Sequence, residues 1–295
     1  MNHHPVLLSE VLETFEGKSL HNFFDATVGA GGHAQAILEK HTEIKLYIGC
    51  DRDPKALEIA EKILNPWKEK IYLLQGNFSH IPKYLQEKNV TCVDGILFDF
   101  GLSSMQLDDK ERGFSFYGGP LDMRMDPANT LTAEDVVNEL SEKKLGYIFR
   151  DFGEERHWRS VAKRITIARK KKRITRAEEL VKIIRPVLGK RQKIHPATRI
   201  FQALRIFVND EPIAIKQGVK KAVECLCEEQ RIAVISFHSL EDRLIKHIFR
   251  DEKDQKNLLV LTKKPLVATE EERRKNPRSR SAKMRVGEKN RKDYE

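Results

Sequence analysis

In the stretch NFFDATVGAGGH, residues 22–33, an apolar run leads directly into a group of glycines. An apolar run bounded by glycines is typical of a β-strand that ends in a tight turn. The residues that follow, AQAILEKH (34–41), read as a helix. A strand, a glycine turn and a helix in this order predict the first half of a β-α-β unit.

The same alternation continues through the first hundred residues. Further strands are predicted at KLYIGCD (45–51), IYLLQG (71–76) and VDGILFDFG (93–101). Asp53 and Pro54 supply an N-cap and a first-turn proline for the helix that follows residue 51. Repeated units of this kind predict an α/β fold with a parallel, doubly wound, Rossmann-like sheet.

A long interval separates these strands from the next convincing one, RIAVISF (231–237). A crossover needs only about a dozen residues, and the interval contains helix start signals but no good strand. We therefore expect a discontinuous sheet domain made of residues 1–106 and 208–295. Residues 107–207 are expected to form an inserted, all-helical subdomain.

The last third of the chain is expected to complete the sheet domain. A helix is predicted at residues 212–228, and two terminal strands at 258–262 and 282–286. The polar segment ATEEERRKNPRSR (268–280) reads as a loop or as disordered chain. Helix N-caps are predicted at Thr132, Ser141, Thr175 (in a capping box with Glu178) and Ser239.

The composition excludes several classes of protein. With 40% hydrophobic and 33% charged residues, the chain can form a sizeable core. No apolar run approaches bilayer length, and the start MNHHPVLLSEVLE is no signal peptide, so we expect a cytoplasmic protein without membrane contact. Four cysteines do not make a disulfide scaffold. Cys225 and Cys227 lack a second zinc-ligand pair and read as packing residues, as do Cys50 and Cys92.

The positive charge is concentrated in two segments. Residues 159–176 hold nine basic residues and no acid, and residues 273–292 hold ten basic residues and one acid. Because the whole chain carries +10, the remainder is mildly acidic. Two basic segments on an acidic body favour a polyanion such as nucleic acid as partner, although each alone could be a solvated surface.

Acidic and glycine residues recur where the predicted strands end. Ligands of such sheets bind at the carboxyl ends of the strands. Asp51 lies 22 residues after Gly29, which is the spacing for an acid that binds ribose hydroxyls. Phe78 could cover an adenine, and Asp99 ends the fourth strand. The pattern indicates a cofactor that contains adenosine.

The glycine turn narrows the choice of cofactor. Gly29-x-Gly31-x-x-Ala34 fits the loose dinucleotide pattern, but the turn lacks the lysine of an ATP-binding loop. Asp25 would repel a pyrophosphate and suits the ammonium group of S-adenosylmethionine, unless it serves only the turn. A nicotinamide dehydrogenase and a non-catalytic RNA-binding protein remain the alternatives.

The chain resembles the bacterial RsmH (MraW) family of methyltransferases nearly end to end. The motifs that carry the resemblance include HHPVLLSEVLE, DATVGAGGHA, GCDRDPKAL, DGILFDFGLSSMQLDDKERGFSF, FRDFGEERHWRSVAKRI, HPATRIFQALRIFVN and ISFHSLEDRLIKHIF. Departures are small: residues 25–29 read DATVG where relatives often have DGTFG, and Met105 stands where proline is common.

The resemblance implies a class I, S-adenosylmethionine-dependent methyltransferase with an inserted helical domain that engages RNA. It implies methylation of the exocyclic N4 of a decoding-centre cytidine in 16S ribosomal RNA, within an assembled or late-assembling small subunit and without a metal. The cofactor contacts that it implies are Gly31, Gly32, His33, Asp51, Phe78, Asp99 and Gln106.

The chemistry of a cytosine amine adds one candidate. Its lone pair is delocalised into the ring, so transfer needs in-line placement and acceptors for the amine hydrogens. The loop DFGLSS (99–104) is expected to provide them, with Asp99 as the candidate catalytic residue.

For several other candidate residues, the sequence is compatible with either a functional or a purely structural role. Phe114, Phe116 and Tyr117 could stack on an extruded base or join the subdomains, and His195 and Arg199 could hold phosphates or simply begin a helix. His238 and Ser239 could border the target pocket or cap a helix.

Overall fold

The structure is a computed structural model that describes residues 5–102, 106–107, 109–189 and 195–291. The chain forms two compact units, one of Met1–Gly101 with Pro212–Glu295 and one of Leu102–Glu211. The helical unit thus begins five residues before, and ends four residues after, the expected limits of 107 and 207. Among the described residues, no helix combines the length and apolar character required to cross a bilayer.

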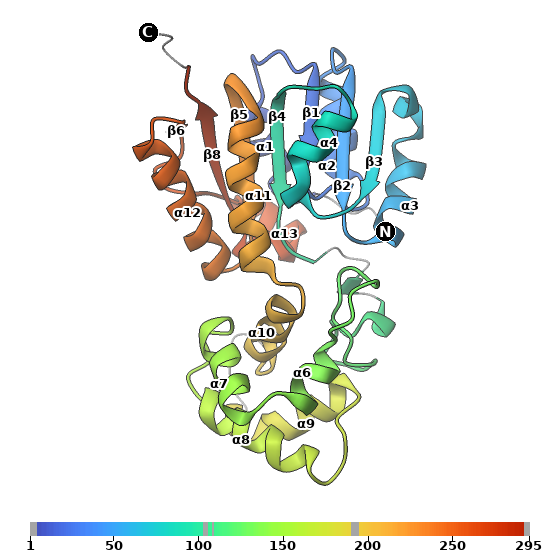
Figure 1. The fold of residues 1–295 in the computed structure, drawn as a ribbon, viewed down its shortest axis with the longest axis vertical. Helices are drawn as coiled ribbons and strands as arrows, with labels where there is room; N and C mark the ends of the chain where they lie inside the picture. Colours follow the sequence, from blue (N-terminus) through green and yellow to red (C-terminus); the bar gives the residue numbers. More distant parts are fainter. Residues whose placement is uncertain (1–4, 103–105, 108, 190–194, 292–295) are drawn as a thin grey trace. The chain divides into compact units, whose positions relative to one another are not determined.

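The first unit is built on one sheet with the strand order β3-β2-β1-β4-β5-β8-β6, and β7 pairs with β8 (Figure 1). Strands β3, β2, β1, β4 and β5 run parallel, whereas β8 is antiparallel to β5, β6 and β7. The strands are β1 Asn22–Asp25, β2 Leu46–Asp51, β3 Ile71–Gln75, β4 Val93–Asp99, β5 Leu226–Ser236, β6 Leu258–Val260, β7 Leu266–Val267 and β8 Lys283–Lys289. The predicted α/β sheet is confirmed.

Both faces of the sheet are covered, because successive strand residues point to opposite sides. Phe23 and Tyr47 join the core under one set of helices, and Phe24 and Ile48 join the core under another. The first set is α1 Leu8–Thr14, α2 Gly32–Lys40 and α3 Pro54–Ile63; the second is α4 Ile81–Glu87, α11 Glu211–Cys225 and α12 Ser239–Asp254 (Figure 1).

The second unit packs helices around a separate apolar core. Between Leu102 and Glu211, the described residues contain one isolated bridge, Pro120 with Arg176, and no named strand. The helices are α6 Ala133–Glu139, α7 Glu142–Asp151, α8 Trp158–Arg169, α9 Ala177–Leu188 and α10 Thr198–Val208. The expected absence of strands therefore holds for the described part of this unit.

Two predicted N-caps in this unit are confirmed and one is wrong. Thr132 forms a capping box with Asp135, and the Ser141 side chain accepts from the amide of Lys144. At α9 the N-cap is Arg176, without a side-chain cap. Glu178 pairs with the Arg176 guanidinium instead of closing a box with Thr175.

The sheet unit contains two further differences from expectation. His238, and not Ser239, caps α12, because its imidazole Nδ1 accepts the amide of Glu241. The segment expected to be loop or disordered chain contains α13, Glu270–Lys275, followed by a short 3-10 helix at Pro277–Ser281. An N-cap at Thr269 and i,i+4 ion pairs between glutamates and basic residues stabilise α13.

Much of the basic charge is paired within the protein. In the segment 159–176, Lys172 bonds to Glu179, and Arg173 contacts three acidic side chains of α6. In the segment 273–292, Lys283 and Arg285 share one aspartate, Asp242. The two basic segments therefore offer less free positive charge to a polyanion than their composition indicates.

The interpretation of Cys92 and Cys227 as packing residues is wrong, because a disulfide joins them across 135 positions of the sequence. The helix α11 ends at Cys225, so Cys227 lies on β5, where the pairing of Val93 with Leu226 brings it close to Cys92. Cys50 is buried in the core as expected.

The disulfide gives a first prediction. Reductant should lower the free energy of unfolding by about 2–4 kcal/mol, because the open chain regains conformational entropy in the unfolded state. Differential scanning calorimetry with and without reductant measures the change. Cys227→Ser should remove the sensitivity to reductant and Cys225→Ser should keep it. Identical transitions of the unaltered protein with and without reductant would contradict the bond.

Candidate cofactor site at the strand ends

The carboxyl ends of β1, β2 and β4 lie side by side, because β1 pairs with both of the other strands. Each of the three ends in an aspartate: Asp25, Asp51 and Asp99. The turn after β1 links the three ends through hydrogen bonds. The amide of Val28 donates to a carbonyl of β2, and the amide of Ala26 donates to a carbonyl of β4.

The glycines of this turn are required by its backbone. Gly29 and Gly31 have φ angles of +52° and +89°, a region that residues with a side chain rarely adopt. A Cβ at Gly32 would approach the Pro5 ring to 2.9 Å. Gly31 is the N-cap of α2, and no side chain caps this helix, whose N-terminus thus follows directly on the glycine turn.

Asp51 is fixed by backbone amides on both of its oxygens. Oδ2 accepts from Gly29 and Oδ1 accepts from Asp53, each at 2.9 Å. Each oxygen retains a second lone pair that a ribose hydroxyl could use. Burial raises the pKa of Asp51 to about 6, against these hydrogen bonds.

The Asp25 carboxylate stabilises the glycine turn by accepting hydrogen bonds within the protein. Its oxygens accept from the Thr27 amide at 3.1 Å and from the Tyr47 hydroxyl at 2.8 Å, and the residue is 1% exposed. Burial raises its pKa to about 7, and nearby Asp51 adds to the shift. The geometry favours the turn interpretation of Asp25 over a direct contact with an ammonium group.

Of the three aspartates, Asp99 has the fewest hydrogen bonds to its carboxylate oxygens among the described residues. Its amide donates to Thr27 Oγ1 at 2.6 Å, which fixes the end of β4 against the glycine turn. The carboxylate Oδ2 lies 3.5 Å from His33 Nδ1. Its Oδ1 is buried and has no hydrogen-bond partner among the described residues. Burial, with Asp25 and Glu241 nearby, raises the pKa of Asp99 to about 8.

His33 is oriented by the N-terminal segment. Its Nε2 lies 3.0 Å from the carbonyl oxygen of Val6, which can only accept, so Nε2 carries a hydrogen. The contact between His33 Nδ1 and Asp99 Oδ2 is then attractive if a single proton lies between them, bound either to the ring nitrogen or to the carboxylate. His33 and Asp99 therefore form a pair in which a proton can be placed on the carboxylate or on the ring.

A buried acceptor without a partner, beside two further carboxylates, fits a cationic ligand that donates hydrogen bonds. S-adenosylmethionine is such a ligand, since it carries an ammonium and a sulfonium group. Its ribose hydroxyls match the remaining capacity of Asp51. The residues present therefore fit this cofactor.

Two residues from the expected cofactor set, Phe78 and Gln106, are largely buried within the protein. Phe78 is 8% exposed, and its ring packs against Phe98, Phe100 and Gly218. Its role over an adenine stays a prediction. Gln106 belongs to the helical unit and is 6% exposed there. Ser103 and Ser104, of the expected acceptor loop, lie outside the described residues.

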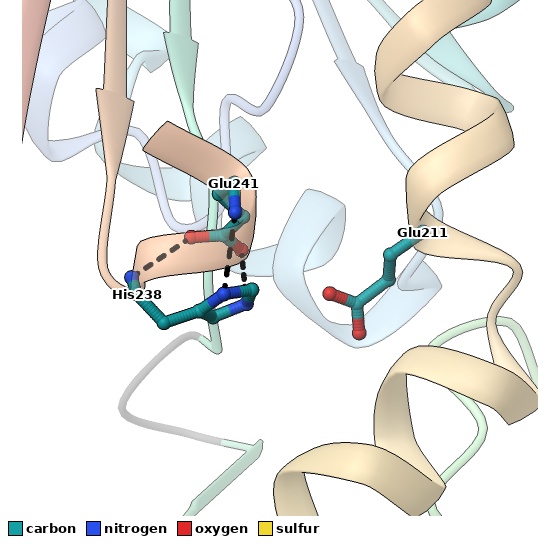
Figure 2. Close-up of side chains that lie close together, drawn as sticks. All are labelled: Glu211, His238 and Glu241. Atoms are coloured by element: carbon teal, nitrogen blue, oxygen red, sulfur yellow. Dashed lines mark hydrogen bonds and ion pairs between the residues drawn. The ribbon is translucent and has the colours of Figure 1, made fainter. Parts of the chain in front are cut away.

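His238 is engaged with the helix that follows it. Figure 2 shows its imidazole against Glu241, with Nε2 at 3.0 Å from Oε1. Glu241 is almost fully buried and also accepts from the amide of Phe237. These contacts support the capping interpretation of His238.

Two residues that hold the carboxylates in place, Tyr47 and Thr27, were not predicted from the sequence. Tyr47 lies among apolar neighbours, and Thr27 lies inside the quoted stretch DATVGAGGHA without having been singled out. Their roles follow only from the register, which pairs Phe23 with Tyr47. Strand alternation could have shown that Tyr47 points to one face, but not that its hydroxyl reaches Asp25.

An open sheet with this strand order, a glycine turn after β1 and acids at the next strand ends defines a class I, S-adenosylmethionine-dependent methyltransferase. Comparison with known families supports this class. The chain belongs to the MraW methylase family, whose sequence model matches residues 1–290. The family resemblance is thereby confirmed, and the dehydrogenase and non-catalytic alternatives fall away.

Individual relatives are similar over almost the whole chain. Ribosomal RNA small subunit methyltransferase H of Protochlamydia amoebophila is 49% identical, covering 97% of each chain. The protein of the same name from Persephonella marina is 47% identical, covering 97% of this chain and 98% of its own. The crystal structure of a putative rRNA-methylase from Clostridium thermocellum is 13% identical, with a TM-score of 0.47, and covers 97% and 99%.

The raised pKa values give a second prediction. As the pH rises from about 5 to about 8, affinity for S-adenosylmethionine should increase about tenfold, because ionised Asp99 attracts its cationic groups and ionised Asp51 is the stronger acceptor for its ribose hydroxyls. Titration calorimetry across this range measures it. In Asp99→Asn the increase at the upper end should be lost. A pH-independent affinity of the unaltered protein would show that the carboxylates do not face the ligand.

Proposed function

We propose that the protein transfers a methyl group from S-adenosylmethionine to the exocyclic N4 of a decoding-centre cytidine in 16S ribosomal RNA. The names of the relatives support a small-subunit ribosomal RNA as substrate. The observation that carries the chemistry is the buried Asp99 Oδ1, an acceptor without a described partner at the end of β4. The reaction needs no metal ion, and the enzyme works in the cytoplasm, on an assembled or late-assembling subunit.

The residues that would hold the cofactor are Gly31 and Gly32, through close backbone approach, with His33, Asp51 and Asp99. Asp51 accepts the ribose hydroxyls. When bound, S-adenosylmethionine supplies an electrophilic methyl group on a positively charged sulfur. Phe78 and Gln106 complete the proposed cofactor set.

Asp99 accepts a hydrogen bond either from the cofactor ammonium or from the target amine. In the second role it receives the proton that the amine loses once the new carbon–nitrogen bond has formed. A carboxylate with a pKa of about 8 is matched to a proton transfer near neutral pH. His33, 3.5 Å from Oδ2, would stabilise either protonation state.

The helical unit is proposed to engage RNA. The exposed basic residues of α8 and the turn after it include Lys163, Lys170 and Lys171. Exposed lysines can contact phosphates without sequence preference. The paired cations of the same segment contribute less.

Nucleoside analysis tests the proposed function. Mass spectrometry of digested 16S ribosomal RNA should show N4-methylcytidine in cells with the gene and its loss in cells without it. Complementation with Asp99→Asn should restore less than about a hundredth of the methylation rate, since the acceptor loses its charge. A rise in the KM for S-adenosylmethionine indicates the cofactor role, and a fall in kcat indicates the amine role.

Asp94→Asn is a matched control, because Asp94 lies at the other end of β4 and accepts the amides of His21 and Asn22. It should retain methylation. Persistence of N4-methylcytidine without the gene would refute the proposed target. Full activity of Asp99→Asn would refute the role of Asp99.

A further inference from the structure

The helical unit carries an aromatic cluster at its surface, made of Phe116, Tyr117 and His195. The rings of Phe116 and His195 stack, with centroids 4.4 Å apart and planes 11° from parallel. Phe116 also meets the largely buried Phe201 of α10 edge-to-face at 5.0 Å. The cluster is therefore anchored in the core of the unit.

Tyr117 is the exposed member of the cluster. It is 79% exposed, and its ring meets His195 and Phe116 at 6.0 Å and 6.4 Å between centroids. Single exposed apolar side chains are common, so exposure alone says little. A second observation, independent of exposure, is that the stacked rings of Phe116 and His195 lie beside Tyr117.

The backbone around Tyr117 is tightly constrained. Gly118 and Gly119 follow it with φ angles of +135° and +99°, and a Cβ at Gly119 would overlap the carbonyl oxygen of Lys110. The Tyr117 amide donates to Ser115 Oγ at 3.2 Å. This turn fixes the backbone that carries the ring, which reduces the entropy lost when a ligand stacks on it.

His195 adds a polar group of defined orientation. Its Nδ1 accepts the amide of Ala197 at 3.3 Å, so the neutral ring carries its hydrogen on Nε2. Nε2 has no partner among the residues that the structure describes. The cluster therefore combines an open aromatic face with a nearby hydrogen-bond donor.

An acidic side chain lies beside the turn that follows Tyr117. It is Glu178, whose Oε2 is 3.7 Å from the Cβ position of Gly118. Glu178 is paired with Arg176 at 2.6 Å, so its charge is compensated. Residues 190–194, which precede His195, lie outside the described part of the chain.

We infer that this cluster is a stacking platform for one unpaired base of the RNA substrate. The base stacks on Tyr117, and the His195 Nε2 hydrogen bonds to a phosphate or to a carbonyl of the base. Stacking on an aromatic ring is how proteins commonly hold single-stranded RNA, because every base has a π face. The inference rests on the proposed function only in taking RNA as the substrate.

Tyr147 offers a comparison within the same unit. It is 39% exposed on α7, but Arg150 lies 4.6 Å from the centroid of its ring. A cation over the ring already occupies a face that a base would need. Tyr147→Ala is therefore a matched control for loss of an exposed tyrosine.

The experiment titrates the full-length protein, with S-adenosylmethionine present, into a small-subunit RNA fragment. The fragment carries 2-aminopurine at its unpaired positions, one at a time, and stacking quenches this fluorophore. Tyr117→Ala should weaken RNA binding about tenfold and remove the quenching at one position. Tyr117→Phe and Tyr117→Trp, which keep the aromatic face, should retain both, and Tyr147→Ala should behave as the unaltered protein.

Two readouts separate the possible failures. Affinity for S-adenosylmethionine should be equal in all variants, which also reports that they are folded. If Tyr117→Ala binds and quenches like the unaltered protein while methyl transfer continues, the platform is refuted and the proposed function stands. If the unaltered protein neither binds nor methylates the RNA, the proposed function fails and the inference falls with it.

Discussion

Desolvation of three aspartate carboxylates at neighbouring strand ends is the constraint on which the cofactor site depends. Burial raises the pKa values of Asp51, Asp25 and Asp99 to about 6, 7 and 8. An unfolded aspartate ionises near 3.8, so the folded protein loses stability as the pH rises from there through these values. A bound cation offsets this cost, which couples cofactor binding to stability.

The turn after β1 makes this arrangement possible. It hydrogen bonds to both neighbouring strands and supplies Thr27 Oγ1 to the amide of Asp99. Gly29, in turn, donates to Asp51. One short segment thus fixes the distance between carboxylates from two other strands, and its glycines allow the backbone to do so without side chains in the way.

Sequence patterns predicted the parts of the molecule that depend on local chemistry. Apolar runs located most of the strands, and strand ends located Asp51 and Asp99. They did not locate β7 or the start of β5, which was assigned to the preceding helix. Features that depend on contacts between residues far apart in the sequence were not predicted. The burial of Asp25 depends on Tyr47 of the next strand, and the bond of Cys92 depends on the register of β4 with β5. The cap at His238 was assigned to the adjacent serine because serine is the commoner cap.

The link between Cys92 and Cys227 encloses β4, the whole helical unit and α11 in one covalent ring. A protease that cuts anywhere inside this ring leaves both pieces attached to each other. The helical unit can therefore be nicked, or can open locally, while β4, which ends at Asp99, and β5, which precedes His238, stay tethered at their opposite ends. Under oxidising conditions, damage to the inserted unit would not by itself release it from the catalytic sheet.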